Sequence, residues 1–150
     1  MPVKFHFHKQ DHWFSCVPAC VRMVLECFGY FEPEAYLRQL LECDESGTRA
    51  GKVVEVVKEH FGLTKSKIGR LTLDELQEEI SLGLYPIAYI DLLDQGVQNA
   101  HAVIVIEFVA DKVHVVDPDY DENDGLRTFD LAEFNRAWMA VSGRTIIISK

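Results

Sequence analysis

An almost uninterrupted apolar run extends from Cys16 to Phe28 and limits the folds that this chain can adopt. At about 100° per residue, its charged residues Arg22 and Glu26 fall together and form a narrow polar stripe. A helix that is apolar on almost every side is stable only when other elements cover it. The run therefore predicts a buried helix that begins at Cys16.

The rest of the chain divides into a helical first part and a strand-rich second part, with the change near Gly83. Amphipathic periodicity, a capping-box spacing and a terminal glycine predict three more helices before this point. They are Glu32–Cys43, Ala50–Gly62 and Thr72–Ile80. A late helix is predicted at Asp130–Trp138.

β-Branched runs predict the strands of the second part. These strands are Leu84–Leu93, Asn99–Val109, Lys112–Pro118 and Arg144–Ser149. Only a short turn separates the second from the third, so we expect these two to pair as an antiparallel hairpin. No repeat or linker interrupts the pattern. We therefore expect one α+β domain over residues 1–150, with helices packed against an antiparallel sheet.

Composition excludes several classes of protein. The net charge is −9, and the lysines and arginines do not cluster, which argues against a nucleic-acid partner. No apolar run approaches the ~18 residues of a membrane span, and the first residues do not have the pattern of a signal peptide. We expect a cytoplasmic chain whose four cysteines are reduced.

Four residues are the candidates for catalysis; in chain order they are Gln10, Cys16, His101 and Asp117. In the expected hairpin, His101 opens one strand and Asp117 ends the next, so the two lie beside each other at one edge of the sheet. A thiol at a helix N-terminus with an imidazolium nearby can become a nucleophilic thiolate. The side-chain amide of Gln10 and the backbone N–H of Cys16 could then stabilise an oxyanion.

The sequence gives less support to other roles for the cysteines and histidines. Cys20 and Cys27 return to nearly the same helix face as Cys16 and are expected in the core. A zinc site remains an alternative, but the ligand spacing does not repeat compactly. Its candidate ligands are His6, His8, His12, Cys16 and Cys20.

The acidic segment from Asp117 to Asp130 resembles a calcium loop only in part. Its turn glycine, Gly125, comes one position late, and no long helix precedes the loop. We expect a solvated turn there. The prediction is accordingly for a protein without a metal or cofactor.

The ordered set resembles the papain-type peptidases, and more narrowly the bacteriocin-processing peptidases that remove double-glycine leaders. In that family a glutamine precedes the cysteine by six residues and an apolar helix follows it. A histidine strand and an Asp-Pro strand end come later. The matching segments here are Gln10, Cys16, Cys20, "MVLECFGY", "YLRQLLECDESGTRAGKVVEVVKEHFGL" and "AHAVIVIEFVADKVHVVDP". The resemblance implies a papain-like fold with a central helix that starts at the cysteine.

The chain departs from that family on both sides of the cysteine. Ser15 stands where an acidic residue is usual, and we expect it to cap the helix. Val17 stands where glycine is usual, and it is expected to narrow the cleft together with Trp13. The membrane and nucleotide-binding segments of an exporter are not expected in this chain, so any exporter would be a separate partner.

The resemblance implies a cysteine peptidase that cleaves a leader or precursor peptide through a thioester, after small residues such as Gly-Gly. In this scheme Cys16 is the nucleophile and His101 is the base and acid. Asp117 orients the imidazole, and Gln10 donates to the oxyanion. Two alternatives stay open at this stage: a related fold that binds peptides without cleaving them, and an acyltransferase or deamidase that uses the same thiol.

Overall fold

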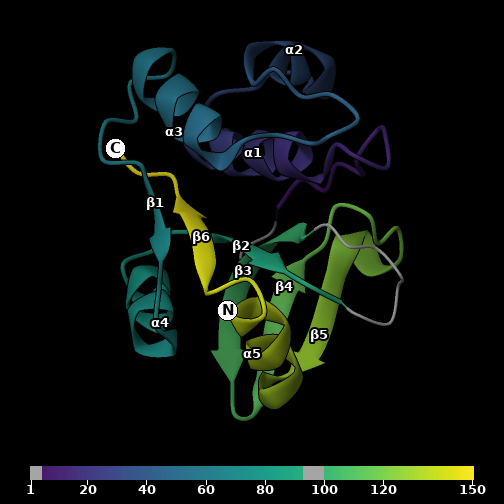
Figure 1. Ribbon diagram of the computed structural model, residues 1–150, viewed down its shortest axis with the longest axis vertical. Coiled ribbons are helices and arrows are strands. Elements are labelled where there is room, and N and C mark those ends of the chain that lie inside the picture. Colours follow the sequence, from purple (N-terminus) through teal and green to yellow (C-terminus); the bar gives the residue numbers. More distant parts are fainter. Residues whose placement is uncertain (1–4, 93–99) are drawn as a thin grey trace.

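The computed structural model describes residues 5–92 and 100–150 (Figure 1). Its helices are α1 (Cys16–Cys27), α2 (Glu34–Leu40), α3 (Ala50–Glu59), α4 (Leu73–Ser81), the 3-10 turn η2 (Asn123–Gly125) and α5 (Leu131–Met139). Its strands are β1 (Lys67–Arg70), β2 (Ile87–Ile90), β3 (His101–Val109), β4 (Lys112–Val116), β5 (Leu126–Asp130) and β6 (Arg144–Ile147). None of these described helices is long and apolar enough to cross a membrane.

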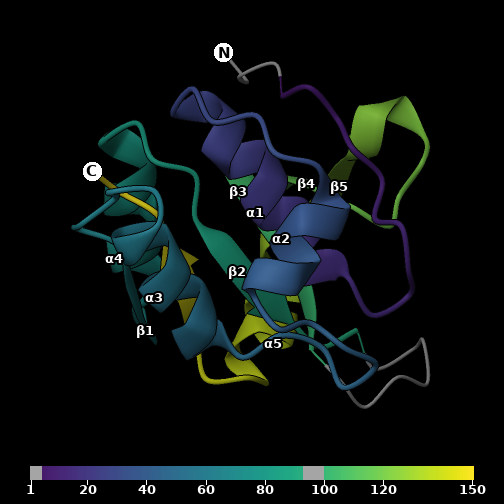
Figure 2. The same ribbon diagram turned by 90° about the horizontal axis from the view of Figure 1, so that it is seen from above.

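The six strands form one antiparallel sheet in the order β1-β6-β2-β3-β4-β5. Successive side chains of a strand point to opposite faces, so a central strand can serve two hydrophobic cores. Ala102 and Ile104 of β3 face the core shared with α1, α2 and α3, whereas Val103 and Val105 face the core shared with α4 and α5. Figure 2 shows α1, α2 and α3 on the same side of the sheet. The expected α+β fold is confirmed.

Helix α1 lies between α2 and β3, and most of its side chains are fully buried. Its polar stripe is where the periodicity places it, with Arg22 Nε 4.0 Å from a carboxylate oxygen of Glu26. The placement of Cys27 in the core was wrong, because its thiol is exposed at the last residue of the helix. Cys20, one turn after Cys16, is completely buried as expected.

Local sequence patterns correctly predicted the positions of most helices and strands. The Thr72 hydroxyl accepts from the backbone N–H of Glu75, and the Glu75 carboxylate accepts from the backbone N–H of Thr72, which completes the predicted capping box. Strands β3 and β4 pair as the expected hairpin. Helix α2 is shorter than predicted at both ends. Leu93 and Asn99, the predicted limits of two strands, lie outside the described residues.

Two strands were missed, and both lie at an edge of the sheet. Strand β1 has only four residues and contains Gly69, so its sequence shows little β propensity. Strand β5 lies within the segment that was interpreted as a solvated turn, and it is held by five residue pairs with β4. Pairing with a neighbouring strand, rather than local propensity, makes both segments extended.

Candidate active site

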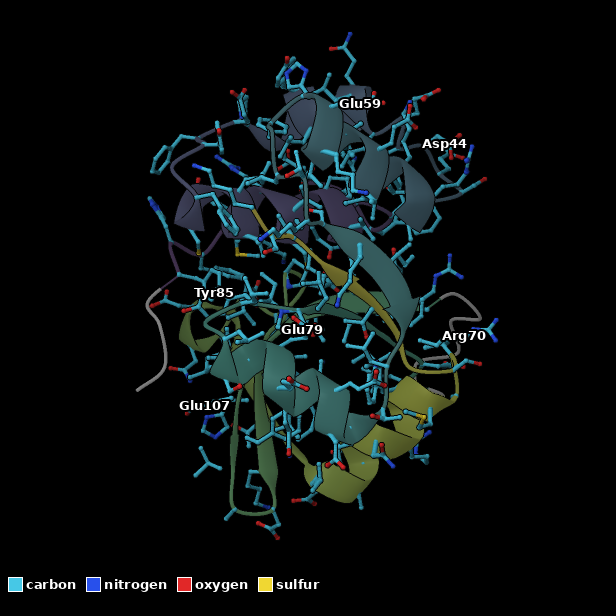
Figure 3. All side chains as sticks on the ribbon, turned by 90° about the vertical axis from the view of Figure 1, so that its left-hand side faces the viewer. Asp44, Glu59, Arg70, Glu79, Tyr85 and Glu107 are labelled. Atoms are coloured by element: carbon cyan, nitrogen blue, oxygen red, sulfur yellow. The ribbon has the colours of Figure 1, made fainter. Side chains whose placement is uncertain are left out.

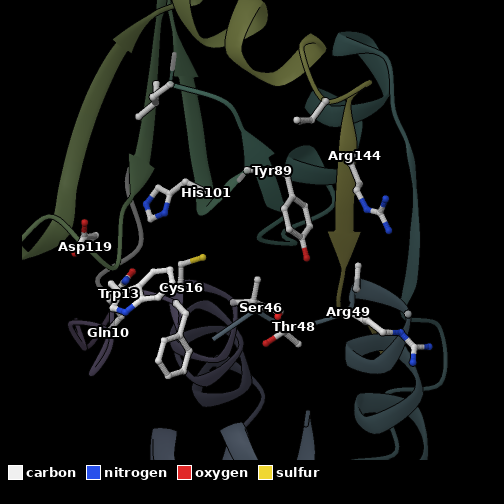
Figure 4. Close-up of a pocket in the computed structure, with 18 of the residues that line it drawn as sticks. Gln10, Trp13, Cys16, Ser46, Thr48, Arg49, Tyr89, His101, Asp119 and Arg144 are labelled. Atoms are coloured by element: carbon white, nitrogen blue, oxygen red, sulfur yellow. The ribbon is translucent and has the colours of Figure 1, made fainter. Parts of the chain in front are cut away.

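A cleft of about 910 Å³ opens where the N-terminus of α1 meets the ends of β2, β3 and β6 (Figure 4). Gln10, Cys16 and His101 all line it. They come from three different parts of the chain: the segment before α1, the first residue of α1 and the first residue of β3. The fold therefore brings these predicted residues to one cavity.

Asp117 follows β4 and accepts a hydrogen bond from His101, with Nε2 2.6 Å from Oδ1. Pairing of β3 with β4 positions the start of one strand beside the end of the other, as the hairpin predicts. Asp117 is only 1% exposed. Because Nε2 of His101 is bonded to Asp117, Nδ1 is the ring nitrogen left to interact with Cys16.

Two further donors hold Asp117. The backbone N–H of Asp119 donates to Oδ1 at 2.9 Å, and Nη1 of Arg127 donates to Oδ2 at 2.8 Å. The Arg127 guanidinium also lies over the ring of Phe129, 4.8 Å from its centroid. Arg127 was not predicted as a site residue. It belongs to the missed strand β5, and only the register of that strand places it beside Asp117.

The turn at Gly125 fixes the backbone of Asp117, whose N–H donates to the Gly125 carbonyl at 2.8 Å. Gly125 has φ +76°, and a Cβ there would lie 2.2 Å from Cε1 of Phe7. Only glycine fits this conformation and this close contact. The glycine that comes too late for a calcium loop thus supports the carboxylate beside His101.

The pair shifts the pKa of both its members. Burial by itself favours neutral His101, but hydrogen bonds to Asp117 and Cys16 outweigh it and raise the pKa of His101 to about 10. Burial would likewise raise the pKa of Asp117, but the bonds from His101, Asp119 and Arg127 outweigh it and lower that pKa. At neutral pH the imidazole is therefore positively charged beside the sulfur of Cys16.

Cys16 occupies the first position of α1, where backbone N–H groups have no acceptor within the helix. Ser15 precedes it as expected, but its side chain does not cap α1. The Ser15 hydroxyl instead accepts from the N–H of His12 and donates to the His12 carbonyl, both at 3.0 Å. The N–H groups of Cys16 and Val17 therefore remain available to a ligand at the helix N-terminus.

Gln10 is 7% exposed and is anchored at both its backbone and its side chain. Its backbone N–H donates to the Pro118 carbonyl at 2.9 Å, next to Asp117. Its Nε2 donates to the His12 carbonyl at 2.9 Å. An amide nitrogen carries two N–H groups, so one hydrogen stays free for an acceptor in the cleft.

Trp13 and Val17 line the same cleft in different ways. Trp13 is 72% exposed at the rim, whereas Val17 is 4% exposed and packs into the core beneath the cleft. Cys20 does not reach the cleft, and its thiol lies 3.5 Å from the Ala102 carbonyl. Burial raises the pKa of Cys20 well above that of a free thiol, which makes it a poor nucleophile.

The ligands of the alternative zinc site do not come together around the cleft. Among residues 5–92 and 100–150, the His, Cys, Asp and Glu side chains that group closely enough to hold a metal are His6, His8 and Glu26. The carboxylates of the acidic segment, whose resemblance to a calcium loop was only partial, do not group closely enough to hold a metal either. Instead, Asp121 pairs with Lys9 and Asp130 pairs with Lys112.

The sequence matches the peptidase C39 family over residues 4–150. No curated protein matches the sequence. Several solved structures share the fold, and the three that follow do so at low sequence identity.

The peptidase domain of Streptococcus ComA, a bifunctional ABC transporter, is 21% identical, with a TM-score of 0.77 over 98% of this chain and 100% of that one. A double-glycine motif protease from an AMS/PCAT transporter, solved with its leader peptide, is 20% identical, with a TM-score of 0.79 over 99% and 93%. A C39-like peptidase from Bacillus anthracis is 14% identical, with a TM-score of 0.81 over 98% and 95%. Because the family match covers nearly the whole sequence, this chain belongs to the peptidase C39 family of cysteine peptidases.

Proposed function

We propose that the protein hydrolyses peptide bonds with Cys16 as nucleophile. The observation that carries the proposal is the pair of His101 and Asp117, 2.6 Å apart, beside a cysteine at a helix N-terminus. The Cys16 thiolate attacks the scissile carbonyl carbon, and the His101 imidazolium gives its proton to the leaving amine. Water then attacks the thioester while neutral His101 takes its proton, and the acid product leaves.

Two donors would stabilise the oxyanion formed in each half of the reaction. One is the backbone N–H of Cys16, and the other is the free N–H of the Gln10 amide. The bond from Gln10 to the His12 carbonyl supports this role, because it fixes the amide before substrate arrives. The proposed catalytic residues come from both halves of the chain. We therefore propose that residues 1–150 form one catalytic domain.

Asp117→Asn is expected to reduce kcat/KM far less than removal of Cys16. Asparagine still accepts a hydrogen bond from the Nε2–H of His101 and holds the ring, but it lacks the negative charge of aspartate. The pKa of His101, raised to about 10 with Asp117 present, should fall. The imidazolium that serves as general acid is then lost at lower pH, so the alkaline limb of kcat/KM against pH moves down.

A pH profile of kcat/KM for the wild-type chain and this variant checks the expectation. A variant that is folded but wholly inactive at every pH would show that Asp117 has another role. An unshifted alkaline limb would show that the carboxylate does not control protonation of His101.

We further propose that the substrate has small residues, such as Gly-Gly, immediately before the scissile bond. Val17 lies beneath the cleft next to Cys16, and Trp13 stands at its rim, so bulky side chains would meet both. A peptide library randomised at the two positions before the cut should be enriched in Gly and Ala among cleaved products. Val17→Ala, which keeps a good helix former, should widen tolerance for larger side chains. Preference for large aliphatic residues would contradict the proposal.

The AMS/PCAT protease that shares this fold was solved with a leader peptide, which supports a leader or precursor peptide as the substrate class here. A separate exporter in the membrane would then be the partner, and the chain would act in the cytoplasm. An electrophilic peptide probe tests the enzyme class directly. Mass mapping should find the adduct at Cys16, and none should form in Cys16→Ala. Absence of labelling in the folded chain would favour a binding protein. Release of ammonia, or transfer of the acyl group to an added amine, without peptide cleavage would favour a deamidase or an acyltransferase.

A further inference from the structure

Three arginines, Arg49, Arg70 and Arg144, line the end of the cleft away from Gln10 and Trp13; we call this the arginine end. Figure 4 shows Arg49 and Arg144 there, and Figure 3 shows Arg70 near the end of β1. Arg70 and Arg144 are directly opposite each other in the antiparallel pair of β1 and β6. Like charges in that arrangement destabilise a sheet.

No carboxylate among the described residues lies within ion-pair distance of these three side chains. This is unexpected in a chain with 24 acidic and 15 basic residues, where acidic partners are plentiful. The arginine end thus concentrates positive charge in the one cavity that contains the nucleophile. An anion would relieve the repulsion between Arg70 and Arg144.

The N-terminus of α3 also lies at the arginine end of the cleft. Arg49 is its N-cap residue but makes no side-chain cap, and Ala50 and Gly51 also line the cleft. The backbone N–H groups of Ala50 and Gly51 have no acceptor within this ten-residue helix. Unpaired N–H groups and the positive end of the helix dipole both favour a negatively charged ligand.

The Tyr89 hydroxyl is an independent sign of a ligand. Tyr89 is only 8% exposed, its hydroxyl has no hydrogen-bond partner among the described residues, and it points into the cleft (Figure 4). The guanidinium of Arg144 lies 5.9 Å from the centroid of its ring. Burial is the main cause that raises the pKa of Tyr89, so the hydroxyl keeps its proton and can donate it in a hydrogen bond. A buried donor without an acceptor is costly unless a ligand supplies one.

We propose that the arginine end and Tyr89 bind a carboxylate of the peptide substrate, an inference that rests on the proposed peptidase function. A carboxylate suits the planar guanidinium groups, which donate two parallel N–H bonds, and it accepts from Tyr89 and the α3 backbone as well. The carboxylate belongs either to an Asp or Glu side chain or to the C-terminus of the peptide. Its recognition would determine which peptides are cleaved.

The sheet order gives the position of this carboxylate in the substrate. β6 is two strands from β3, which carries His101. Neighbouring strands are about 4.8 Å apart, so Arg144 lies on a strand about 10 Å from that of His101. An extended peptide rises about 3.3 Å per residue. The carboxylate should therefore lie on the third to fifth residue from the scissile bond.

The test uses Gly-Gly peptides that carry one Glu, or a matched Gln, at each position from the third to the fifth residue on either side of the cut. Glu at one of these positions should raise kcat/KM about 10-fold or more over Gln, as expected for hydrogen bonds to a charged group. The preference should weaken between 0.05 M and 0.5 M NaCl. Shortened peptides with a free or amidated C-terminus form a second arm, and a preference only for the free terminus would identify that carboxylate as the ligand.

Arg144→Gln and Arg70→Gln should each reduce this preference to about 2-fold or less, whereas Arg136→Gln should retain it. Arg136 is the matched control because it is also exposed but does not line the cleft. Tyr89→Phe should reduce the preference several-fold without lowering Tm, since it removes a buried hydroxyl that has no partner. A purely structural Tyr89 would leave the preference unchanged.

The proposal is overturned if neither arm shows a preference, or if the preference survives in both arginine variants. If no peptide is cleaved, the proposed peptidase function has failed instead. The inference about the carboxylate is then tested by binding: fluorescence anisotropy measures the affinity of the wild-type chain for labelled peptides. Binding of the Glu peptide, or of the free C-terminus, about 10-fold more tightly than its neutral match would support it. Equal affinities would exclude it.

Discussion

Cys16→Ala and His101→Ala are each expected to abolish peptide hydrolysis, with kcat/KM reduced by about 1000-fold or more. Nucleophile and base act as one unit, so removal of either one removes the covalent route. Among the described residues, Cys16 is the only cysteine that lines the cleft, so its sulfur has no substitute there. Hydrolysis of a quenched fluorescent peptide gives the rates directly.

Both variants should stay folded, because each altered side chain lines an open cleft. In His101→Ala the buried Asp117 still has Arg127 and the Asp119 N–H as partners. His101→Gln, which keeps a polar side chain beside Asp117, covers the case in which alanine destabilises the chain. Circular dichroism and thermal unfolding verify the fold.

Cys27→Ala is the matched control for the nucleophile, since its thiol is exposed and lies outside the cleft. It should retain the wild-type rate. Residual activity above a few per cent in folded Cys16→Ala or His101→Ala would argue strongly against the assignment.

Gln10→Ala is expected to lower kcat by about 10- to 1000-fold, the range found when one oxyanion donor is removed. The backbone bond from residue 10 to the Pro118 carbonyl does not need the side chain, so the segment should keep its course. Alkylation of Cys16 builds no oxyanion. The rate of labelling by iodoacetamide should therefore fall much less than the rate of hydrolysis.

Parallel loss of labelling and hydrolysis would instead mean that Gln10 positions the cysteine. Gln39→Ala makes the same substitution at an exposed position of α2 and should change neither rate. Comparison of the two variants separates the oxyanion role from any general effect of losing an amide.

The pairing of His101 with Asp117 shows how much of the site could be predicted. Both residues lie in β-branched runs separated by a short turn, and a hairpin brings the start of one run to the end of the other. Arg127 shows the limit. Its strand has a mixed polar sequence, "LRTFD", that carries no clear period, so nothing local indicates that Arg127 reaches Asp117.

Ser15 illustrates a different limit. Serine before a helix favours an N-cap, and the residue does occupy that position. Its hydroxyl is nevertheless engaged by the backbone of His12, because the chain turns back on itself just before the helix. Propensity predicted the position correctly, but the competing hydrogen-bond partner depends on the path of the loop.

Sequence patterns alone predict the buried helix at Cys16, the hairpin and the order of the four proposed catalytic residues. These follow from periodicity and short spacings, which act between near neighbours in the chain. The bond from Arg127 to Asp117 and the position of Arg70 opposite Arg144 become visible only in the folded chain. Such contacts depend on strand order and register between distant segments. That order is set by how both faces of the sheet are buried, which no local stretch of sequence specifies.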